Sequence, residues 1–196
     1  MSRGTHRFPP EKMHVLDSPE RRKMMPAEPL LSALPVTKQD VIVDLGAGTG
    51  YFSIPAAKLT RETVYAVDVE PKMLEALKEN VQTQNVSNVV PMTGAIENIP
   101  LEDDTADLII ASLVLHSVNP ISDGLQEIRR VLKDGGKLLC LDWEPKESPM
   151  GPPLEVRVSS SNMEEALQKA GFGITKRLFP EEFLYVLVAA KESFQL

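Results

Sequence analysis

The chain has 196 residues, which fits a single domain, because domains typically contain about 100–200 residues. Its composition, 42% hydrophobic and 25% charged, is ordinary for a soluble globular domain and excludes a disordered chain or a disulfide scaffold. The net charge of −7 argues against a general nucleic-acid binder, since an acidic protein does not attract phosphate backbones over its whole surface.

Two features indicate a cytoplasmic protein. Cys140 is the single cysteine, so the chain cannot form an internal disulfide, which fits a reducing compartment. The first 30 residues contain no apolar core of a signal peptide, and no apolar run approaches the ~20 residues that cross a bilayer. We therefore expect no membrane partner. The three histidines have no metal-ligand spacing, so we expect no metal site either.

The first 34 residues are expected to form a leader and short helices. Residues 1–16 have no regular pattern and are expected to be a loose leader. Ser18 and Pro19 predict a helix start, because serine caps helices and proline suits the first helical position. A second short helix is expected at 26–34. We interpret the basic run at 21–23 as the solvated face of the first helix.

From residue 40 onward, apolar strands alternate with helices. Strands are expected at 41–45, 63–68, 88–92, 106–111 and 137–142. Helices are expected at 51–59, 71–84 and 121–132, and Asp134-Gly135-Gly136 is expected to end the last of them. This alternation predicts an α/β fold, in which a mostly parallel sheet has helices on both faces.

The last 54 residues are expected to complete a seven-stranded sheet. A loop at 143–160 is rich in proline and serine, and Ser161-Asn162-Met163-Glu164 is a capping-box pattern that predicts a helix ending at Gly171. Two final strands are expected at 174–179 and 183–190. The connection between them is too short for a parallel crossover, so they should form an antiparallel hairpin.

Two features at the carboxyl ends of the predicted strands point to a nucleoside cofactor, since ligands of such sheets bind there. Val43–Gly50 reads Val-Asp-Leu-Gly-Ala-Gly-Thr-Gly, and its glycines allow a sharp turn and a close approach to a ligand. Asp68 ends the second strand, where a carboxylate can accept hydrogen bonds from ribose hydroxyls or cap the helix that opens at Pro71. A nicotinamide dinucleotide usually requires G-x-G-x-x-G, whereas this loop reads G-x-G-x-G.

The assembled pattern resembles the class I S-adenosylmethionine-dependent methyltransferases, over residues 40–190. The residues that carry the resemblance are Val43–Gly50, Val67-Asp68, Gly94–Pro100, Asp107–Ala111 and Leu125–Gly136. Within that superfamily, the chain resembles small proteins related to the menaquinone and ubiquinone methylases. The resemblance implies a Rossmann-like methyltransferase domain at 35–196, after a leader and lid helices at 1–34. Within this part, residues 8–34 are expected to fold over the cofactor.

The resemblance also implies which residues bind S-adenosylmethionine. Residues expected along its methionine and ribose parts are Asp44, Gly46, Ala47, Gly48 and Gly50. Asp68 is expected to hold the ribose hydroxyls, and Val69 to border the adenine. Ala95 and Ile96 are expected beside the adenine edge. Relatives usually have Asp at the position of Ala95, so one contact to the adenine amino group should be missing here.

Candidates on the acceptor side follow the fourth and first strands. Ser112 and Leu113 are expected near the transferred methyl group, and Tyr51 near the methionine end of the cofactor. His116 has a side chain that can act as a base near neutral pH, although the sequence favours the alternative of a helix-terminus or packing histidine.

Three further candidates lie after the fifth predicted strand. Asp142 could orient an acceptor, and Trp143 could stack on a flat or cationic one; loop capping and packing are the alternatives. Arg157 could hold an anionic substrate or form a surface salt bridge.

The function expected from this resemblance is in-line methyl transfer from S-adenosylmethionine to a small-molecule acceptor. The enzyme is expected to act as a monomer or homodimer, without a nucleic-acid partner. A non-catalytic S-adenosylmethionine-binding protein is the main alternative, and a nicotinamide-dependent oxidoreductase is a weaker one. An RNA or protein methylase has no support, because the chain contains no Asn-Pro-Pro-Tyr motif.

Overall fold

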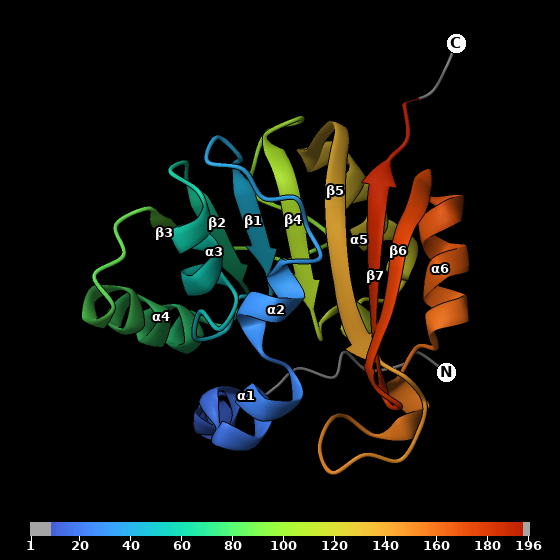
Figure 1. Cartoon of the computed structure of the whole chain (residues 1–196), viewed down its shortest axis with the longest axis horizontal. Coiled ribbons are helices and arrows are strands. Elements are labelled where there is room, and N and C mark those ends of the chain that lie inside the picture. Colours follow the sequence, from blue (N-terminus) through green and yellow to red (C-terminus); the bar gives the residue numbers. More distant parts are fainter. Residues whose placement is uncertain (1–8, 194–196) are drawn as a thin grey trace.

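A sheet of seven strands, in the order β3-β2-β1-β4-β5-β7-β6, forms the centre of the molecule (Figure 1). The computed structural model describes residues 9–193, except for the side chains of residues 10, 12 and 14. Residues 1–8 of the leader expected at 1–16 therefore lie outside the described residues. The strands are β1 (Ile42–Leu45), β2 (Val64–Asp68), β3 (Val89–Thr93), β4 (Ala106–Ser112), β5 (Leu132–Trp143), β6 (Phe172–Glu181) and β7 (Leu184–Lys191).

Strand pairing confirms the predicted mixed sheet. The first five strands pair in parallel, β1 with β2 and β4, β2 with β3, and β4 with β5. In contrast, β7 runs antiparallel to both β5 and β6. The chain moves outward from β1 to β3 and returns with β4 on the other side of β1. The carboxyl ends of β1 and β4 therefore form the switch point at which such sheets bind ligands.

Helices cover both faces of the sheet, as predicted. One face carries α2 (Ala27–Leu31), α3 (Ser53–Leu59) and α4 (Pro71–Thr83), and the other carries α5 (Ile121–Val131) and α6 (Ser160–Lys169) (Figure 1). Successive residues of β4 point to opposite faces: Leu108 and Ile110 belong to the first core, and Ile109 and Ala111 to the second. Burial on both faces explains why the central strands are continuous apolar runs.

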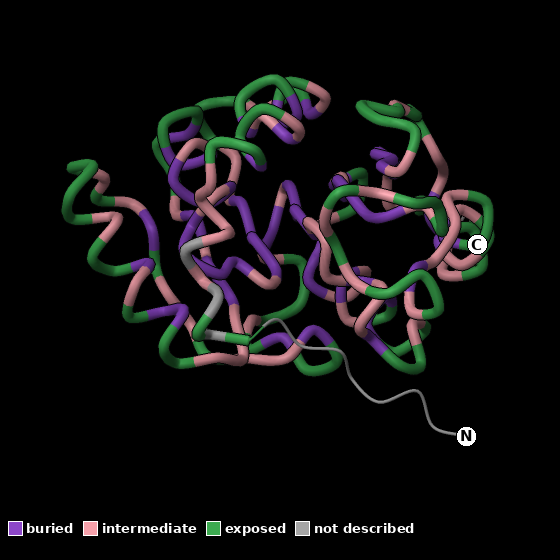
Figure 2. The backbone as a smooth tube through the Cα atoms, turned by 90° about the horizontal axis from the view of Figure 1, so that it is seen from below, coloured by how far each residue is buried: buried purple, intermediate pink, exposed green. Residues whose placement is uncertain are grey.

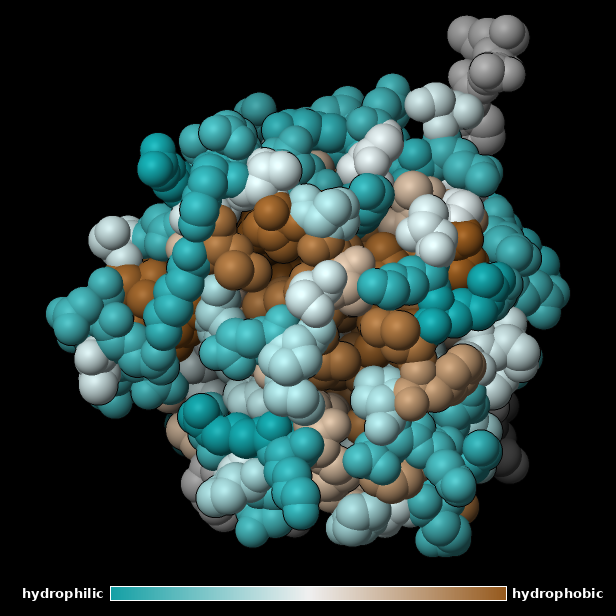
Figure 3. All heavy atoms as spheres, in the orientation of Figure 1, coloured by the Kyte–Doolittle hydropathy of each residue, from teal (hydrophilic) through white to brown (hydrophobic). Residues whose placement is uncertain are grey.

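The first core is partly visible from outside. Figure 3 shows apolar residues in the middle of this face and hydrophilic residues around its edge. Ala33, Val36, Leu178 and Phe183 are among the partly buried residues that pack on this core.

Two helix ends differ from the sequence prediction. Ser159, rather than Ser161, caps α6, because its backbone is extended and its Oγ accepts from the Asn162 N–H at 3.3 Å. The helix α5 ends at Val131 and passes directly into β5, so Asp134-Gly135-Gly136 does not end it. Gly135, at φ +74°, instead lies where the register of β4 against β5 shifts. The pairing of β5 with β4 therefore decides the structure at Gly135, and the local glycine pattern does not.

The N-terminal segment is more ordered than predicted. Residues 10–16, expected in the leader, belong to the 3-10 helix η1 (Pro10–Asp17), which is followed by α1 (Pro19–Met24). Ser18 caps α1 as predicted, since its Oγ accepts from the Arg21 N–H at 3.2 Å. The second helix, α2, is shorter than expected, and α3 begins after Tyr51 and Phe52 rather than at Tyr51.

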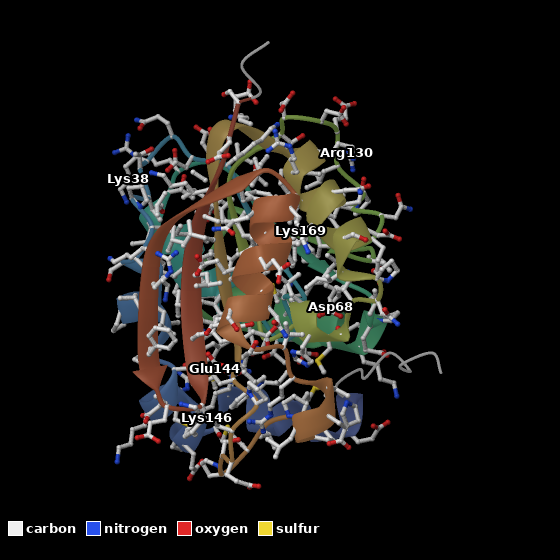
Figure 4. All side chains as sticks on the ribbon, turned by 90° about the vertical axis from the view of Figure 1, so that its right-hand side faces the viewer. Lys38, Asp68, Arg130, Glu144, Lys146 and Lys169 are labelled. Atoms are coloured by element: carbon white, nitrogen blue, oxygen red, sulfur yellow. The ribbon has the colours of Figure 1, made fainter. Side chains whose placement is uncertain are left out.

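Both η1–α1 and the segment after β5 lie beyond the carboxyl ends of the parallel strands (Figure 1). Figure 2 looks at the molecule from this side and shows buried backbone in the middle with exposed segments around it. In Figure 4, Asp68 and Glu144 lie toward this end, while Lys38 and Arg130 lie toward the opposite one. The two covering segments therefore enclose the switch point.

Candidate active site

A cavity of about 480 Å³ lies at the switch point. This volume is in the range of small-molecule sites, about 300–1,000 Å³. Its walls come from η1 and α1, from the loop after β1, and from the carboxyl ends of β2, β4 and β5. Predicted site residues that line it are Asp44, Gly46, Ala47, Gly48, Tyr51, Asp68, Val69, Ile96, Ser112, Leu113, His116 and Trp143. Twelve residues predicted from the sequence thus lie around one cavity.

The glycine loop has the sharp backbone that the sequence predicted. Gly46 and Gly48 have left-handed φ angles of +66° and +53°. A Cβ atom on Gly46 would lie 2.7 Å from Val114 Cγ2, so a side chain there would collide with the turn after β4. Gly50, at φ +93°, does not belong to the cavity wall. A Cβ there would lie 2.9 Å from Leu77 Cδ1, so Gly50 allows close packing of the loop on α4.

Asp68 connects the glycine loop to the start of α4. Its Oδ2 accepts from the Gly48 N–H at 2.8 Å, and its Oδ1 accepts from the Glu70 N–H at 2.9 Å. The N-cap of α4 is Glu70, which accepts from the Lys72 N–H, so the alternative role of Asp68 as the helix cap is wrong. Asp68 also lines the cavity, and each carboxylate oxygen can accept a further hydrogen bond.

Asp44 is a buried carboxylate in the cavity wall, 2% exposed. Its pKa is raised to about 7, chiefly by burial and also by the negative charge of Asp68, while the hydrogen bond that Ser53 Oγ donates at 2.5 Å acts in the opposite direction. A positive charge placed in the cavity would favour the ionised form of Asp44. The site is therefore electrostatically suited to a cationic ligand group.

Arg21 corrects the interpretation of the basic run at 21–23. Arg22 and Lys23 are exposed, but Arg21 is only 8% exposed and lines the cavity. Its guanidinium lies 4.5 Å from the centre of the Tyr51 ring, and its Nη1 donates to Leu16 O at 2.8 Å. Its Nε is buried without a partner among the described residues, and burial lowers its pKa.

The cation of Arg21 therefore faces the cavity without a carboxylate at ion-pair distance in the described part of the chain. A buried charge is costly unless it is paired, so this position suits an anionic ligand group. The sequence prediction missed Arg21, because no local pattern tells which of three adjacent basic residues turns inward. The contact with Tyr51, 30 positions later, decides it.

Two residues tie the N-terminal segment to the site, and a third holds one of them on α4. The Tyr51 hydroxyl donates to Met25 O at 2.7 Å, and Thr49 Oγ1 donates to Asp17 Oδ2 at 3.1 Å. Asn80 Nδ2 of α4 donates to Thr49 O at 2.9 Å. Together with Pro9, Val15 and Leu16, which line the cavity, these contacts hold η1–α1 against the glycine loop.

A histidine–carboxylate pair occupies the wall formed by β4 and β5. His116 lies in the 3-10 helix η2 (Leu115–Ser117), and its Nδ1 is 2.7 Å from Asp142 Oδ1. Asp142 is fully buried and does not line the cavity, whereas His116 does. Asp142 therefore contacts His116 rather than an acceptor. Ser112 Oγ, in the same wall, is buried without a partner among the described residues.

Arg157 and Trp143 are held by the protein itself. Arg157 donates to Pro152 O at 2.9 Å, to Lys146 O at 2.7 Å and to Ser148 Oγ at 2.8 Å, and it lies 5.1 Å from the Trp143 ring. Arg157 does not line this cavity, and it forms no ion pair within residues 9–193, so its contacts favour neither of the two sequence interpretations. It organises the loop after β5.

Trp143 is 3% exposed and stacks on Phe183, with ring centres 6.2 Å apart, so the packing alternative describes its side chain. From the loop after β5, the residues that do line the cavity are Met150, Gly151 and Pro152.

The expected adenine side is only partly matched. Gly94, Ile96 and Glu97 line the cavity beside Val69, but Ala95 does not and instead pairs with Asn98 in a β-bridge. Other cavity-lining residues that the sequence prediction did not name are Met25, Phe52, Glu70, Met73, Val114, Ser117 and Val118. Most of them follow a predicted site residue by one to four positions, which is the signal that could have identified them.

Residues 9–193 contain no cluster of three or more His, Cys, Asp or Glu side chains that could hold a metal ion. Cys140 is fully buried in β5, and burial raises its pKa well above the usual value, so it is an unreactive thiol. No helix in the same range has the length and apolar character that crossing a bilayer requires.

A family profile described as a methyltransferase domain matches residues 43–140, which is half of the chain. The chain belongs to this methyltransferase family. The matched region begins within β1 and ends within β5, so it contains the glycine loop, Asp68 and the turn after β4.

Similar proteins agree with this assignment. The methyltransferase is 32% identical to the ubiquinone/menaquinone biosynthesis C-methyltransferase UbiE of Haemophilus ducreyi over 111 residues, 55% of this chain and 43% of that protein. It is 30% identical to the ribosomal protein L11 methyltransferase of Anoxybacillus flavithermus over 159 residues, 80% of this chain and 45% of that protein. The chain thus spans less than half the length of these relatives.

A solved structure matches over almost the whole chain. The crystal structure of an S-adenosylmethionine-dependent methyltransferase from Aquifex aeolicus is 26% identical, with a TM-score of 0.87 that covers 94% of this chain and 100% of that one. The cofactor of the methyltransferase is therefore S-adenosylmethionine.

Proposed function

We propose that the protein transfers the methyl group of S-adenosylmethionine to a small-molecule acceptor bound in the cavity. The observation that carries this proposal is one cavity of about 480 Å³ whose wall runs from Asp68 and the glycine loop to Ser112 and His116. The segments η1–α1 and 150–152 contribute to the same wall. A site enclosed in this way fits a small acceptor better than a protein chain.

The residues present fit the cofactor. Gly46, Ala47 and Gly48 line the cavity, and we propose that they and Asp44 border the methionine and ribose parts of the cofactor. Asp68 is proposed to accept from the ribose hydroxyls with the lone pairs that Gly48 and Glu70 leave free.

At the adenine, we propose that Val69 borders the ring and that the Ile96 N–H reaches its edge. Ala95 is outside the cavity wall, so it is not part of this proposal. Near the methyl group we place Ser112, whose buried Oγ has no partner among the described residues, and Leu113.

S-adenosylmethionine supplies a methyl group on a positively charged sulfur, which is already a strong electrophile. The work left for the protein is to align the acceptor with that group and to exclude water. The apolar side chains of Leu16, Leu113, Val114 and Met150 line the cavity and serve the second task. Asp44 provides negative charge near a cationic ligand.

We infer a small acceptor from the size of the cavity and not from the relatives. The name of one relative refers to ubiquinone and menaquinone, and the name of the other to a ribosomal protein. A cytoplasmic location belongs to the same proposal and rests on the single Cys140.

Calorimetry with S-adenosylhomocysteine and with NAD tests the cofactor site. We expect S-adenosylhomocysteine to bind and NAD not to bind. Asp68→Ala should cost about 1–3 kcal/mol of affinity, the size expected for lost charge-assisted hydrogen bonds. Asp107→Ala is the matched control, because Asp107 pairs with Lys133 at the amino end of β4. Undiminished binding by Asp68→Ala contradicts the ribose role.

A screen of acceptor metabolites, followed by release of S-adenosylhomocysteine, tests the reaction. Turnover of a small metabolite supports the proposal. Cofactor binding without turnover of any acceptor, small or macromolecular, would instead favour a non-catalytic S-adenosylmethionine-binding protein.

A further inference from the structure

We infer that His116 is the general base of the reaction, that Asp142 positions it, and that the acceptor therefore carries a weakly acidic O–H group. This inference rests on the proposed function and adds the substrate class and the proton acceptor. The central observation is the buried carboxylate of Asp142, whose hydrogen-bond partners are His116 and Trp143.

Both oxygens of Asp142 are committed. Oδ1 lies 2.7 Å from His116 Nδ1 and accepts from the Trp143 N–H at 2.8 Å, and Oδ2 accepts from the His116 N–H at 3.0 Å. Asp142 is fully buried, so an acceptor cannot reach it. Its function is to hold the backbone and the ring of His116 in one orientation.

The surroundings of Asp142 leave His116 as its ring partner. Cys140 of β5 and Tyr185 of β7 both lie near Asp142. Burial raises the pKa of each of these two side chains, so both stay neutral. Glu144 and Arg157 are the other charged groups that act on this region, and Arg157 is tied to the loop after β5. Asp142 thus accepts from the ring of His116 when Nδ1 carries the proton.

A proton on Nδ1 leaves the lone pair of neutral His116 on Nε2. His116 lines the cavity, and no described residue forms a hydrogen bond to Nε2. A purely structural histidine would need only its Nδ1 contact. Leu113, with a left-handed φ of +58°, makes the sharp turn after β4 that brings His116 to the cavity wall. The free nitrogen is therefore the one that a bound acceptor meets.

The cavity wall beside His116 selects the kind of acceptor. Val114, Val118 and Met150 are apolar, and Ser117 Oγ is occupied as a donor to Val114 O at 2.7 Å. This wall suits a neutral, flat or aliphatic molecule better than a cationic amine. A base is useful only where the acceptor must lose a proton, so a phenolic or enolic hydroxyl fits, and a thioether or tertiary amine does not.

Methyl transfer to a hydroxyl acceptor conserves atoms and electrons. The O–H bond breaks and its proton moves to His116 Nε2, while an oxygen electron pair forms the new bond to the transferred methyl carbon. The carbon–sulfur bond breaks with its electron pair left on sulfur, which gives S-adenosylhomocysteine. The proton on His116 then passes to solvent.

The tautomer of His116 tests the inference without an acceptor. In ¹⁵N-labelled protein at pH 8, we expect the proton on Nδ1 and an unprotonated Nε2, with His116→Gln to assign the resonances. Asp142→Asn offers an amide donor to Nδ1 and should move the proton to Nε2. Asp107→Asn, at the other end of β4, is the control and should leave the tautomer unchanged. A wild-type ring protonated on Nε2 overturns the inference.

Kinetics with phenol and 4-nitrophenol as probe acceptors test the chemistry. His116→Gln should lower kcat for phenol about 10²–10⁴-fold at pH 8. The loss should shrink for 4-nitrophenol, which is already ionised, and for phenol as the pH approaches about 10, the usual range of a phenolic hydroxyl. An equal loss with both probes at every pH indicates a structural role and overturns the inference. So does turnover of a primary amine probe without turnover of either phenol.

Calorimetry with S-adenosylmethionine separates the two proposals. A wild-type protein that does not bind it contradicts the proposed function itself. Normal binding together with a proton on Nε2 contradicts only the role of His116 and leaves the proposed function in place.

Discussion

Replacing Asp44 with Asn should stabilise the ligand-free protein, and increasingly so as the pH rises. Burial raises the pKa of Asp44 from an ordinary 3.8 to about 7 in the folded protein. A raised carboxyl pKa means that the folded state holds its proton more tightly than the unfolded state, so stability falls as the pH rises between these two values. Asn has the same shape and can accept from Ser53, but it never carries the buried charge.

The size of the effect follows from the pKa shift. With a pKa of 3.8 in the unfolded state and about 7 in the folded state, the unfolding free energy should fall by about 3 kcal/mol between pH 5 and pH 8. The wild type should show this loss, and Asp44→Asn should not. Urea unfolding of both proteins without ligand, at pH 5, 6, 7 and 8, measures the difference.

Two further variants sharpen this test. Ser53→Ala removes the hydrogen bond that favours the ionised carboxylate, so it should steepen the pH dependence. The double variant Asp44→Asn/Ser53→Ala should show no such pH dependence, because it has no carboxyl group at this position. A difference between wild type and Asp44→Asn that stays constant from pH 5 to pH 8 would refute the reasoning. Stabilisation should also have a functional cost. Asp44→Asn should bind S-adenosylmethionine less well, and it should lose less affinity for S-adenosylhomocysteine, whose sulfur carries no positive charge.

Three other substitutions give independent tests. Gly50→Ala places a Cβ 2.9 Å from Leu77 at a left-handed φ, so it should lower the unfolding free energy by about 1–3 kcal/mol in urea unfolding. Tyr51→Phe removes the hydrogen bond to Met25 O and should increase proteolytic cleavage within residues 10–25; an unchanged cleavage rate would contradict the role of this bond in holding the segment. Arg157→Gln should speed amide hydrogen exchange at 146–152, where Arg157 bonds three backbone carbonyls, and exchange as slow as in wild type would count against it.

The sheet could be predicted because its signals are local. Four of the five residues at 41–45 are apolar, and such a run followed by glycines predicts a buried strand. The antiparallel direction of β7 follows from the length of one connection. The boundaries of α5 and α6 could not be predicted in the same way, because strand pairing decided whether Gly135 ends a helix or lies in a register shift.

The residues of the candidate site also differ in whether local sequence or distant contacts determine their positions. The positions of the glycine loop and Asp68 in the cavity wall could be predicted, because both directly follow strands that their own sequence defines. The burial of Arg21 depends on a ring 30 positions away, and the partner of Asp142 is 26 positions earlier. The contacts of Arg157 could not be predicted for the same reason, since the carbonyls that hold it belong to a loop whose path no local pattern specifies.

The contact between Thr49 and Asp17 has a consequence for altering the acceptor. The segment that helps to enclose the acceptor is anchored on the loop proposed to hold the cofactor, and Asn80 extends that anchor to α4. Exchange of residues 9–25 for those of a relative would therefore disturb both binding events at once. An engineered change of acceptor in this protein requires the exchanged segment to keep a carboxylate facing Thr49 and a backbone carbonyl facing Tyr51.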